Sequence, residues 1–154
     1  LDFKNRYPHL EVYLEPGEAV GWQTGYLVAT VLDIVENQMS IAILDTSAEA
    51  HMPDTLAMPY RADIKNSDLA NIKKYTYRLS GNTCLAGDII GDYSFDKPLK
   101  EGDKIILEDM IHYTMVKTTT FNGIKLPSIV IKNSQGCYQI VNNFGYNAYK
   151  SRLS

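Results

Sequence analysis

The pattern of apolar and polar positions predicts that most of this chain forms short β-strands. Residues 73–81 (KKYTYRLSG) alternate at period two, as the residues of a half-buried strand do. Residues 24–37 are rich in β-branched side chains, although a helix at the start of this run remains possible. Further strands are expected at residues 10–15, 39–46, 101–110, 113–123 and 127–133, each next to a Gly, Asn, Asp or Pro turn signal.

The segments between these strands have a different character. Residues 47–64 contain two prolines and should not form one regular element throughout. Residues 137–154 are expected to hold one or two short helices, interrupted by Gly145. Closely spaced strands with turn signals and little helix indicate a mainly β fold, either a β-sandwich or a Greek-key-like barrel.

Composition narrows the possible functions. The chain has 154 residues, enough for one domain with a core, and a formal net charge of −3. Its lysines and arginines are scattered, which argues against a nucleic-acid partner. No apolar run is long enough to cross a bilayer and no signal-peptide pattern is present, so no membrane partner is expected. Cys84 and Cys137 lie far apart, which argues against a disulfide framework and favours a reducing cytoplasm.

Residues 80–95 (SGNTCLAGDIIGDYSF) bring a thiol, glycines and carboxylates together in one short run. Glycine allows backbone to approach a ligand or partner closely, and the thiol of Cys84 can transfer a proton or act as a nucleophile. Asp88 and Asp92 could attract cations. In isolation, the simplest interpretation is a strand–turn–strand corner with a buried cysteine.

A second group of candidates follows the predicted strand at residues 39–46. Asp45, Glu49, His51 and Asp54 form an acidic cluster that would suit a polyamine or a metal ion. No clear further zinc ligands accompany them, so we expect no metal site. The alternatives are a solvated acidic loop and, for His51, a hydrogen-bonded structural histidine.

Three residues elsewhere could contact a ligand. Glu15 begins the motif EPG at the end of a predicted strand, where a carboxylate could accept a hydrogen bond from a protonated ring nitrogen. The hydroxyl of Tyr113 could donate to a phosphate, and the ring of Phe121 could pack on the alkyl part of a cation. Taken singly, each has a plainer alternative, a solvated loop glutamate or core aromatics.

The order of these motifs resembles a known family. EPG at 15–17, a strand ending at Asp45, TCLAGD at 83–88 and EDMIHYTMVKTTTFNG at 108–123 resemble the C-terminal region of the fold-type-III pyridoxal-phosphate decarboxylases. The longer strings EPGEAVGWQTGYLVATVLDIVEN, CLAGDIIGDYSF and YKSRLS look most like the branch that acts on carboxynorspermidine and carboxyspermidine. The resemblance therefore implies part of a carboxy-lyase of polyamine biosynthesis that makes norspermidine or spermidine.

The resemblance also implies an architecture. Members of this family pair an N-terminal (β/α)8 barrel, which carries the cofactor lysine, with a C-terminal β domain, and work as homodimers with shared active sites. Residues 1–20 would be the end of the barrel and the crossover, with 10–15 as its last strand. Residues 21–154 would be the β domain, which can include a short C-terminal helix that returns to the barrel. The chain starts at Leu1 and lacks the Schiff-base lysine, so we expect it to be the C-terminal piece of something longer and inactive alone.

Carried over residue by residue, the resemblance gives roles around the cofactor pyridoxal 5'-phosphate. Glu15 matches the residue that binds its pyridine nitrogen, Gly17 belongs to the same cofactor-binding turn, and Tyr113 matches the tyrosine near its phosphate. Cys84 matches a cysteine donated across the dimer interface and is the candidate for reprotonating the substrate carbon. Asp88 matches an aspartate of that interface.

Substrate contacts are implied by the same resemblance. Asp45 falls where amine-forming relatives keep an aspartate for the far amino group of the substrate. The weaker candidates for the same polycationic substrate are Glu18, Glu49, Asp54 and His51. Phe121 matches an aromatic residue of the pocket wall. Carboxylates that accept charge-assisted hydrogen bonds from its ammonium groups are what such a substrate needs.

Two departures from the family pattern affect the substrate and the phosphate. Many relatives carry an arginine after EPG that helps to hold the phosphate, and here the residue is Glu18. Ornithine-type relatives carry an aspartate after the cysteine, where this chain has Leu85. The alternatives to the carboxynorspermidine branch are a diaminopimelate- or ornithine-type decarboxylase and a non-catalytic β module that binds a ligand or protein.

Overall fold

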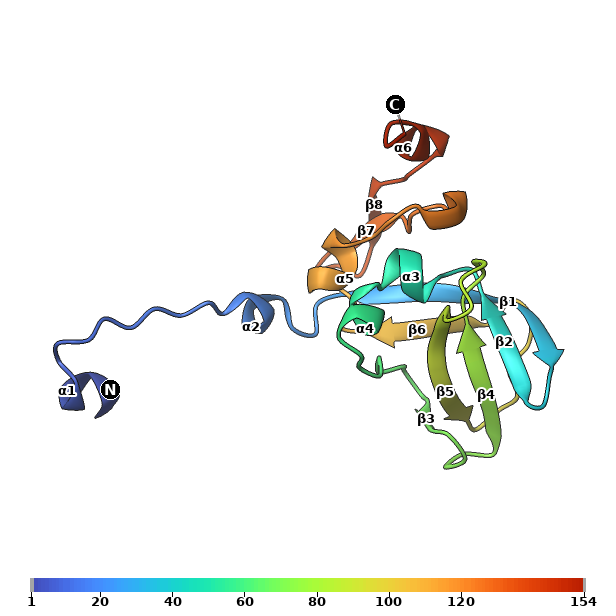
Figure 1. Cartoon of the computed structure of the whole chain (residues 1–154), viewed down its shortest axis with the longest axis horizontal. Helices are drawn as coiled ribbons and strands as arrows, with labels where there is room; N and C mark the ends of the chain where they lie inside the picture. Colours follow the sequence, from blue (N-terminus) through green and yellow to red (C-terminus); the bar gives the residue numbers. More distant parts are fainter. Residues whose placement is uncertain (1, 154) are drawn as a thin grey trace.

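The computed structural model describes residues 2–153 and consists mainly of β-structure (Figure 1). Six strands form one mixed sheet in the spatial order β3-β5-β4-β2-β1-β6. Their bounds are β1 Tyr26–Glu36, β2 Ser40–Leu44, β3 Asp68–Leu69, β4 Tyr75–Ser80, β5 Ile89–Phe95 and β6 Lys104–Glu108. Neighbouring strands are antiparallel except β2 and β4, which run parallel.

The sheet curls until both of its edges meet the same stretch of chain. Ile64 forms an isolated bridge with Leu107 of β6, and the backbone N–H of Glu108 donates to the carbonyl of Asp63 at 2.8 Å. The chain then forms β3, which pairs with β5 at the opposite edge. A register shift in β1 lets this one strand pair with β6 along its first half and with β2 along its second. The curled sheet confirms the mainly β prediction.

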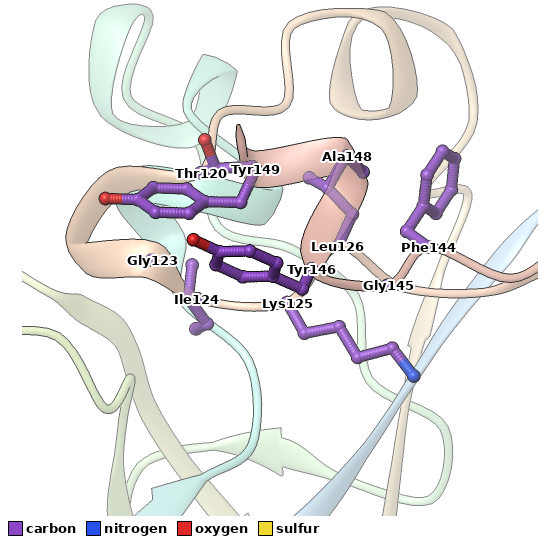
Figure 2. Close-up of a pocket in the computed structure, with 10 residues that line it drawn as sticks. All are labelled: Thr120, Gly123, Ile124, Lys125, Leu126, Phe144, Gly145, Tyr146, Ala148 and Tyr149. Carbon is purple, nitrogen blue, oxygen red and sulfur yellow. The ribbon is translucent and has the colours of Figure 1, made fainter. Parts of the chain in front are cut away.

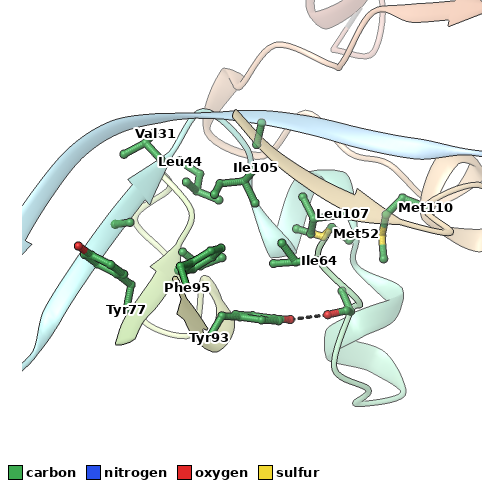
Figure 3. Close-up of a cluster of buried hydrophobic side chains, with 14 residues drawn as sticks. Val31, Leu44, Met52, Ile64, Tyr77, Tyr93, Phe95, Ile105, Leu107 and Met110 are labelled. Carbon is green, nitrogen blue, oxygen red and sulfur yellow. Dashed lines mark hydrogen bonds between the residues drawn. The ribbon is translucent and has the colours of Figure 1, made fainter. Parts of the chain in front are cut away.

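The hydrophobic core lies inside the curled sheet (Figure 3). Five strands each bury two apolar side chains at alternate positions, as the period-two geometry of a strand requires. These pairs are Ala29 and Val31, Ala42 and Leu44, Tyr77 and Leu79, Tyr93 and Phe95, and Ile105 and Leu107. The hydroxyl of fully buried Tyr93 donates to the carbonyl of Ala62 at 2.7 Å, and burial raises the pKa of Tyr93 to about 12. The hydroxyl of Tyr93, which lies deep in this core, is therefore hydrogen-bonded.

Short helices cover one end of the sheet, where β2 and β6 end and β1 begins (Figure 1). α3 (Ala48–His51) and α4 (Asp54–Ala57) occupy the proline-containing connection after β2. α5 (His112–Val116) follows β6, and a 3-10 helix, η1 (Phe121–Gly123), comes after it. α4 contacts both α3 and α5, so the two connections lie side by side.

The two ends of the chain lie outside the curled sheet. At the N-terminus, α1 (Asp2–Arg6) and α2 (Gly17–Gly21) belong to a segment that extends away from it (Figure 1). At the C-terminus, β7 (Ile129–Lys132) and β8 (Tyr138–Asn142) form a separate two-stranded sheet, and α6 (Tyr146–Lys150) follows. Every residue of β8 is exposed, and so are many large apolar side chains of both ends.

The structure confirms the strands predicted within residues 24–37, 39–46, 73–81, 101–110 and 127–133 and corrects the others. Residues 10–15 form no strand, because no described residue lies beside them to complete a ladder. Residues 113–123 contain no strand: α5 and η1 lie at the two ends of this stretch, and residues 117–120 between them are irregular. Within α5, the buried Thr114 faces α4 while its apolar neighbours face solvent. The expected C-terminal helix is preceded by β8. β4 and β5 form the strand–turn–strand corner expected around residues 80–95.

Candidate functional site

Asp88 is the hydrogen-bonding centre of the loops that lie over this end of the sheet. It is buried, and its Oδ1 accepts from the backbone N–H of Ala48 at 2.7 Å and from Ser47 Oγ at 3.1 Å. Its Oδ2 accepts from the backbone N–H of Thr83 at 3.1 Å and from Thr83 Oγ1 at 2.6 Å. Gly81 leaves no room for a Cβ against this carboxylate. Within this chain, Asp88 therefore fastens the loop that carries the cysteine to the start of α3.

Cys84 lies on the surface of that loop, so the interpretation as a buried cysteine is wrong. Its Sγ donates to Oδ1 of Asn122 at 3.3 Å, and its backbone N–H approaches the same oxygen at 3.4 Å. Asn122 adopts a left-handed backbone conformation, with φ of +58°, which asparagine tolerates better than most residues. The thiol is thus both accessible and held at one position.

Asp45 stands at the end of β2 with a fixed carboxylate. Its Oδ1 accepts from the backbone N–H of Thr30 at 2.6 Å, while its own N–H donates to the carbonyl of Thr30 at 3.0 Å. The residue is exposed, and its second oxygen accepts no hydrogen bond from residues 2–153. Asp45 can therefore offer one oriented oxygen to a cation from solvent.

His51 lies behind Asp45, inside the protein. Its Nδ1 is 3.0 Å from Thr46 Oγ1, and its buried Nε2 completes no hydrogen bond within residues 2–153. Burial lowers the pKa of His51, while the backbone of Lys125 and the charges of Asp88 and Asp45 act in the opposite direction. This geometry favours the structural histidine that the sequence left open over direct contact with substrate.

Asp54 is also buried and joins α4 to α5. Its Oδ2 accepts from Tyr60 Oη at 2.7 Å and from Thr114 Oγ1 at 3.1 Å, and its Oδ1 has no partner among residues 2–153. Burial and the hydrogen bond to Asp54 raise the pKa of Tyr60 to about 12. Asp54 therefore links α4 to α5 through its hydrogen bond with Thr114. Because it is buried, it is not open to solvent as a substrate ligand would be.

Tyr113 projects outward from α5, next to the Thr114 that Asp54 holds. Its side chain is exposed, and the ammonium of Lys117 lies 4.8 Å from the centre of its ring. The hydroxyl of Tyr113 on α5 and the ammonium of Lys117, the residue that follows α5, are donors that suit an anion such as a phosphate. Phe121 is exposed on η1, beside the asparagine that contacts the thiol.

The candidates that precede β1 lie on the extended N-terminal segment. Glu15, Gly17 and Glu18 are exposed, and α2, which carries the last two, contacts α5. Glu18 and Tyr113 thus belong to adjacent helices. With no arginine after EPG, Lys117 is a cation that the structure places next to Tyr113.

A cavity of about 260 Å³ lies between residues 120–126 and the C-terminal helix α6 (Figure 2). Tyr146 and Tyr149 of α6 lie over it in Figure 2, facing Ile124 and Lys125. Lys125 is also the residue whose backbone approaches His51. The cavity contains none of the site residues predicted from the sequence and is mainly apolar, so we regard it as a packing space between two segments.

Sequence reasoning missed the residues that hold these groups in place. Asn122, Thr83 and Thr114 each contact a predicted residue. A weak signal existed for Asn122, because an Asn-Gly pair marks a turn with left-handed backbone. Thr114 meets its partner Asp54 from a distant segment, which no local pattern records. Thr83 lies five residues before Asp88 in the same loop, and no motif pointed to their contact.

Taken together, the end of the sheet presents a thiol, an oriented carboxylate and an exposed tyrosine. No cluster of residues 2–153 could hold a metal ion through three or more His, Cys, Asp or Glu side chains. In the same residues, no helix has the length and apolar character needed to span a bilayer. The available chemistry is proton transfer by Cys84 and recognition of cations and anions by the other groups.

Comparison with known proteins extends this picture. The chain is 52% identical to the carboxynorspermidine/carboxyspermidine decarboxylase of Campylobacter jejuni over 98% of its length, and 49% identical to the carboxyaminopropylagmatine decarboxylase of Synechocystis over 99%. It spans 42% and 40% of these two relatives. The crystal structure of the Campylobacter jejuni carboxynorspermidine decarboxylase complexed with norspermidine superposes with a TM-score of 0.89 at 51% identity, over 98% of this chain and 44% of that one.

More distant structures share the fold alone. The diaminopimelate decarboxylase of Methanocaldococcus jannaschii superposes over 84% of this chain with a TM-score of 0.68 at 19% identity. The family described as pyridoxal-dependent decarboxylase, C-terminal sheet domain, matches residues 18–111, which include the curled sheet, Cys84 and Asp88. Because this match covers most of the chain, the chain belongs to the family of pyridoxal-dependent decarboxylases and contains their C-terminal sheet domain.

Proposed function

We propose that this chain is the C-terminal portion of a pyridoxal-phosphate-dependent decarboxylase of polyamine biosynthesis. Its substrate would be carboxynorspermidine or carboxyspermidine, and its product norspermidine or spermidine. The observation that carries the proposal is the 52% identity with the Campylobacter jejuni decarboxylase along 98% of the chain. Because the chain spans 42% of that relative, the rest of the active site would come from a further portion of the protein.

The domain boundaries follow from the same proposal. Residues 2–20, with the exposed stretch at 10–15, would complete a (β/α)8 barrel and lead out of it, and residues 21–153 would be the β domain. Leu1 and Ser154 of the expected ranges lie outside the described residues. A strand needs a neighbour, and a barrel would supply the one that residues 10–15 lack here.

The exposed groups of this chain fit part of a pyridoxal-phosphate site. Glu15 would accept a hydrogen bond from the protonated ring nitrogen, with Gly17 in the same turn. Tyr113 would donate to a phosphate oxygen, and Lys117 would add the positive charge that the missing arginine does not supply. When bound, the cofactor ring takes up the electron pair left as carbon dioxide departs. We place its Schiff-base lysine in the barrel.

Cys84 would complete the reaction by proton transfer. Its S–H would give one proton to the substrate carbon that has lost carbon dioxide, and the thiolate would regain a proton from water. The exposure of Cys84 on a loop supports donation to the active site of a second subunit in a homodimer. Asp88 would then contribute to that interface by holding the loop in shape.

Substrate recognition would depend on exposed carboxylates and one aromatic ring. Asp45 offers an oriented oxygen for a terminal amino group, and Glu18 is exposed on α2. Phe121 would line the pocket beside the alkyl chain. Two free cysteines are compatible with a reducing cytoplasm, where we place the enzyme.

A second candidate substrate is carboxyaminopropylagmatine. The Synechocystis decarboxylase that carries that name is nearly as similar as the first relative, at 49% identity over 99% of the chain. The two substrates would share the reacting end and differ in the cationic group at the far end. Asp45 could bind either an ammonium or a guanidinium there.

The test is a substrate comparison with the complete protein loaded with pyridoxal phosphate. Carboxynorspermidine, carboxyspermidine, carboxyaminopropylagmatine, diaminopimelate and ornithine are offered separately, and the amine product is identified by mass. We expect turnover of a carboxylated triamine and none of ornithine. Absence of carbon dioxide from every substrate, together with a small monomer in solution, would instead support a non-catalytic module.

Two variants assign the roles. Asp45→Ala should raise KM for the triamine while the absorbance of the bound cofactor stays unchanged, and an unchanged KM removes Asp45 from the substrate site. Cys84→Ala should slow turnover by about a hundredfold or give misprotonated product, the usual range for losing a general acid. Normal turnover and normal product from this variant would refute the role of the thiol.

A further inference from the structure

The segment after the EPG motif is fitted tightly against α5 by two glycines. A Cβ placed on Gly21 would lie 2.6 Å from Nε2 of His112, and one on Gly25 would lie 2.7 Å from Cβ of Ile111. Real Cβ atoms are essentially never found this close to other atoms, so a side chain at Gly21 would displace the imidazole of His112 and one at Gly25 would displace Ile111. Close approach of the backbone is therefore what these glycines provide.

Hydrogen bonds fix the same contact beside the glycines. The backbone N–H of Gln23 donates to Oδ1 of Asp109 at 2.9 Å, and the N–H of Met110 donates to the carbonyl of Gly25 at 3.1 Å. Asp109 and Met110 directly precede α5. These two hydrogen bonds join residues 21–25 to the segment that leads into α5.

No hydrogen bond of the His112 ring explains why a histidine stands at this position in the described chain. Its Nε2 is buried and forms no hydrogen bond within residues 2–153. A buried polar atom without a partner is unfavourable, so a polar ring at this place calls for a reason. The imidazole lies against Gly21, with Nε2 2.6 Å from the place that a Cβ of this residue would occupy, and α2 and α5 contact each other here.

Thr114, two residues after His112, is also held by a contact with another helix. Thr114 Oγ1 donates to Oδ2 of buried Asp54 at 3.1 Å, so α5 is held by α2 through residue 112 and by α4 through residue 114. Tyr113 lies between these two contacts and points outward. The backbone of Tyr113 is thus held on both sides.

We propose that His112 is a positioning residue that sets the place of Tyr113 relative to the segment carrying Glu15 and Glu18, through its contact with Gly21. This inference rests on the proposed function, in which Tyr113 contacts the phosphate and Glu15 the ring nitrogen of one cofactor. Both groups serve the same rigid molecule, so a fixed distance between them favours binding. His112 acts through the spacing of α2 and α5 and does not touch the cofactor.

The experiment measures the dissociation constant of pyridoxal phosphate for the complete protein by absorbance titration of the apoenzyme. The variants are Gly21→Ala, His112→Ala and the two combined. Gly145→Ala is the matched control, because a Cβ there meets nothing within 4 Å. Unfolding midpoints and the kcat and KM of the cofactor-saturated enzymes are recorded for each.

Gly21→Ala should weaken cofactor binding by about tenfold, since misplacing a binding group by about 1 Å has effects of at least this size. His112→Ala should weaken it by about threefold, because the spacing is no longer set. The combined variant should bind better than Gly21→Ala alone, since removing the imidazole makes room for the new methyl group. Gly145→Ala should bind as the unmodified protein does.

Specific outcomes overturn the inference. Equal cofactor affinity in Gly21→Ala, or a combined variant no better than Gly21→Ala, means that the contact does not position Tyr113. If Gly21→Ala does not fold, unchanged affinity in His112→Ala refutes the inference by itself. If the unmodified protein binds no pyridoxal phosphate, the proposed function fails instead, and the two failures are thereby distinguished.

Discussion

The curled sheet and the two ends of the chain are built from similar apolar sequences but differ in burial. In the sheet, alternate side chains of each long strand enter a closed core, and Leu44, Leu79 and Leu107 are fully buried. In the β7–β8 hairpin, Tyr138, Ile140 and Val141 are all exposed, although this segment is also strand-forming. β-propensity is thus enough for pairing, whereas burial requires a second layer.

The contrast separates what stabilises the chain from what remains available for contacts. An isolated two-stranded hairpin is marginally stable, and the N-terminal segment exposes Leu14, Val20 and Trp22 in the same way. The exposed side chains of the N-terminal segment fit the proposal that residues 2–20 complete a barrel. Changes in the sheet should therefore alter stability, and changes in the ends should not.

The largest expected effect is in the core. Leu79→Ala should lower the free energy of unfolding by about 2–5 kcal/mol, because it leaves a cavity where a fully buried side chain was. Ile140→Ala is the matched change in the exposed hairpin and should alter the stability of this chain by less than about 0.5 kcal/mol. Urea denaturation measures both, and equal effects would erase the distinction between sheet and ends.

The next effect concerns the polar centre of the loops. Asp88→Asn should cost about 2–3 kcal/mol, since hydrogen bonds to a buried carboxylate are strong and the new NH2 group would face donors. Asp92→Asn is the control on β5, where the carboxylate forms a half-buried, two-hydrogen-bond pair with Arg78 that contributes about 1 kcal/mol. If both variants lose the same stability, Asp88 does not organise the loops.

A smaller effect tests the thiol. Asn122→Gly keeps a residue that accepts the left-handed backbone of η1 but removes the oxygen that Cys84 contacts. We expect an unchanged unfolding midpoint and faster reaction of Cys84 with a thiol reagent, because the sulfur is no longer held. An unchanged rate of alkylation would show that the contact does not restrain the thiol.

The smallest effect depends on pH. Burial lowers the pKa of His51 in the folded state, so below its ordinary value of about 6.5 the unfolded chain binds more protons. Stability should therefore be constant above this pH and fall as the pH drops below it, and His51→Gln should reduce the fall. His9, exposed on the N-terminal segment, is the control, and an equal change in His9→Gln would contradict the assignment.

Local sequence patterns identified much of the sheet, because the alternation of a strand and the residues of a turn both depend on neighbouring positions in the chain. The alternation in residues 73–81 became β4, and its apolar members Tyr77 and Leu79 entered the core. The same kind of pattern failed at 113–123, where a contact between Thr114 and a distant carboxylate accompanies a helix. Residues 10–15 failed for a related reason, since a strand exists only with a partner.

The site shows the same division. Family-like motifs located Cys84, Asp88, Asp45 and Tyr113 along the chain, and three of these four are exposed. They could not tell that His51 and Asp54 are buried, because burial results from the packing of α3 and α4 against other segments.

By itself, the sequence determined the chemical groups and their order: a thiol in a glycine-containing loop, a carboxylate after a strand and a tyrosine after another. Only the tertiary structure decided which of them face solvent and what holds them. Asp88 and Asn122 contact residues about 40 positions away, and Gly21 meets a histidine 91 positions later (112 − 21). Such contacts depend on how the sheet curls, and chain periodicity carries no record of distances between segments so far apart.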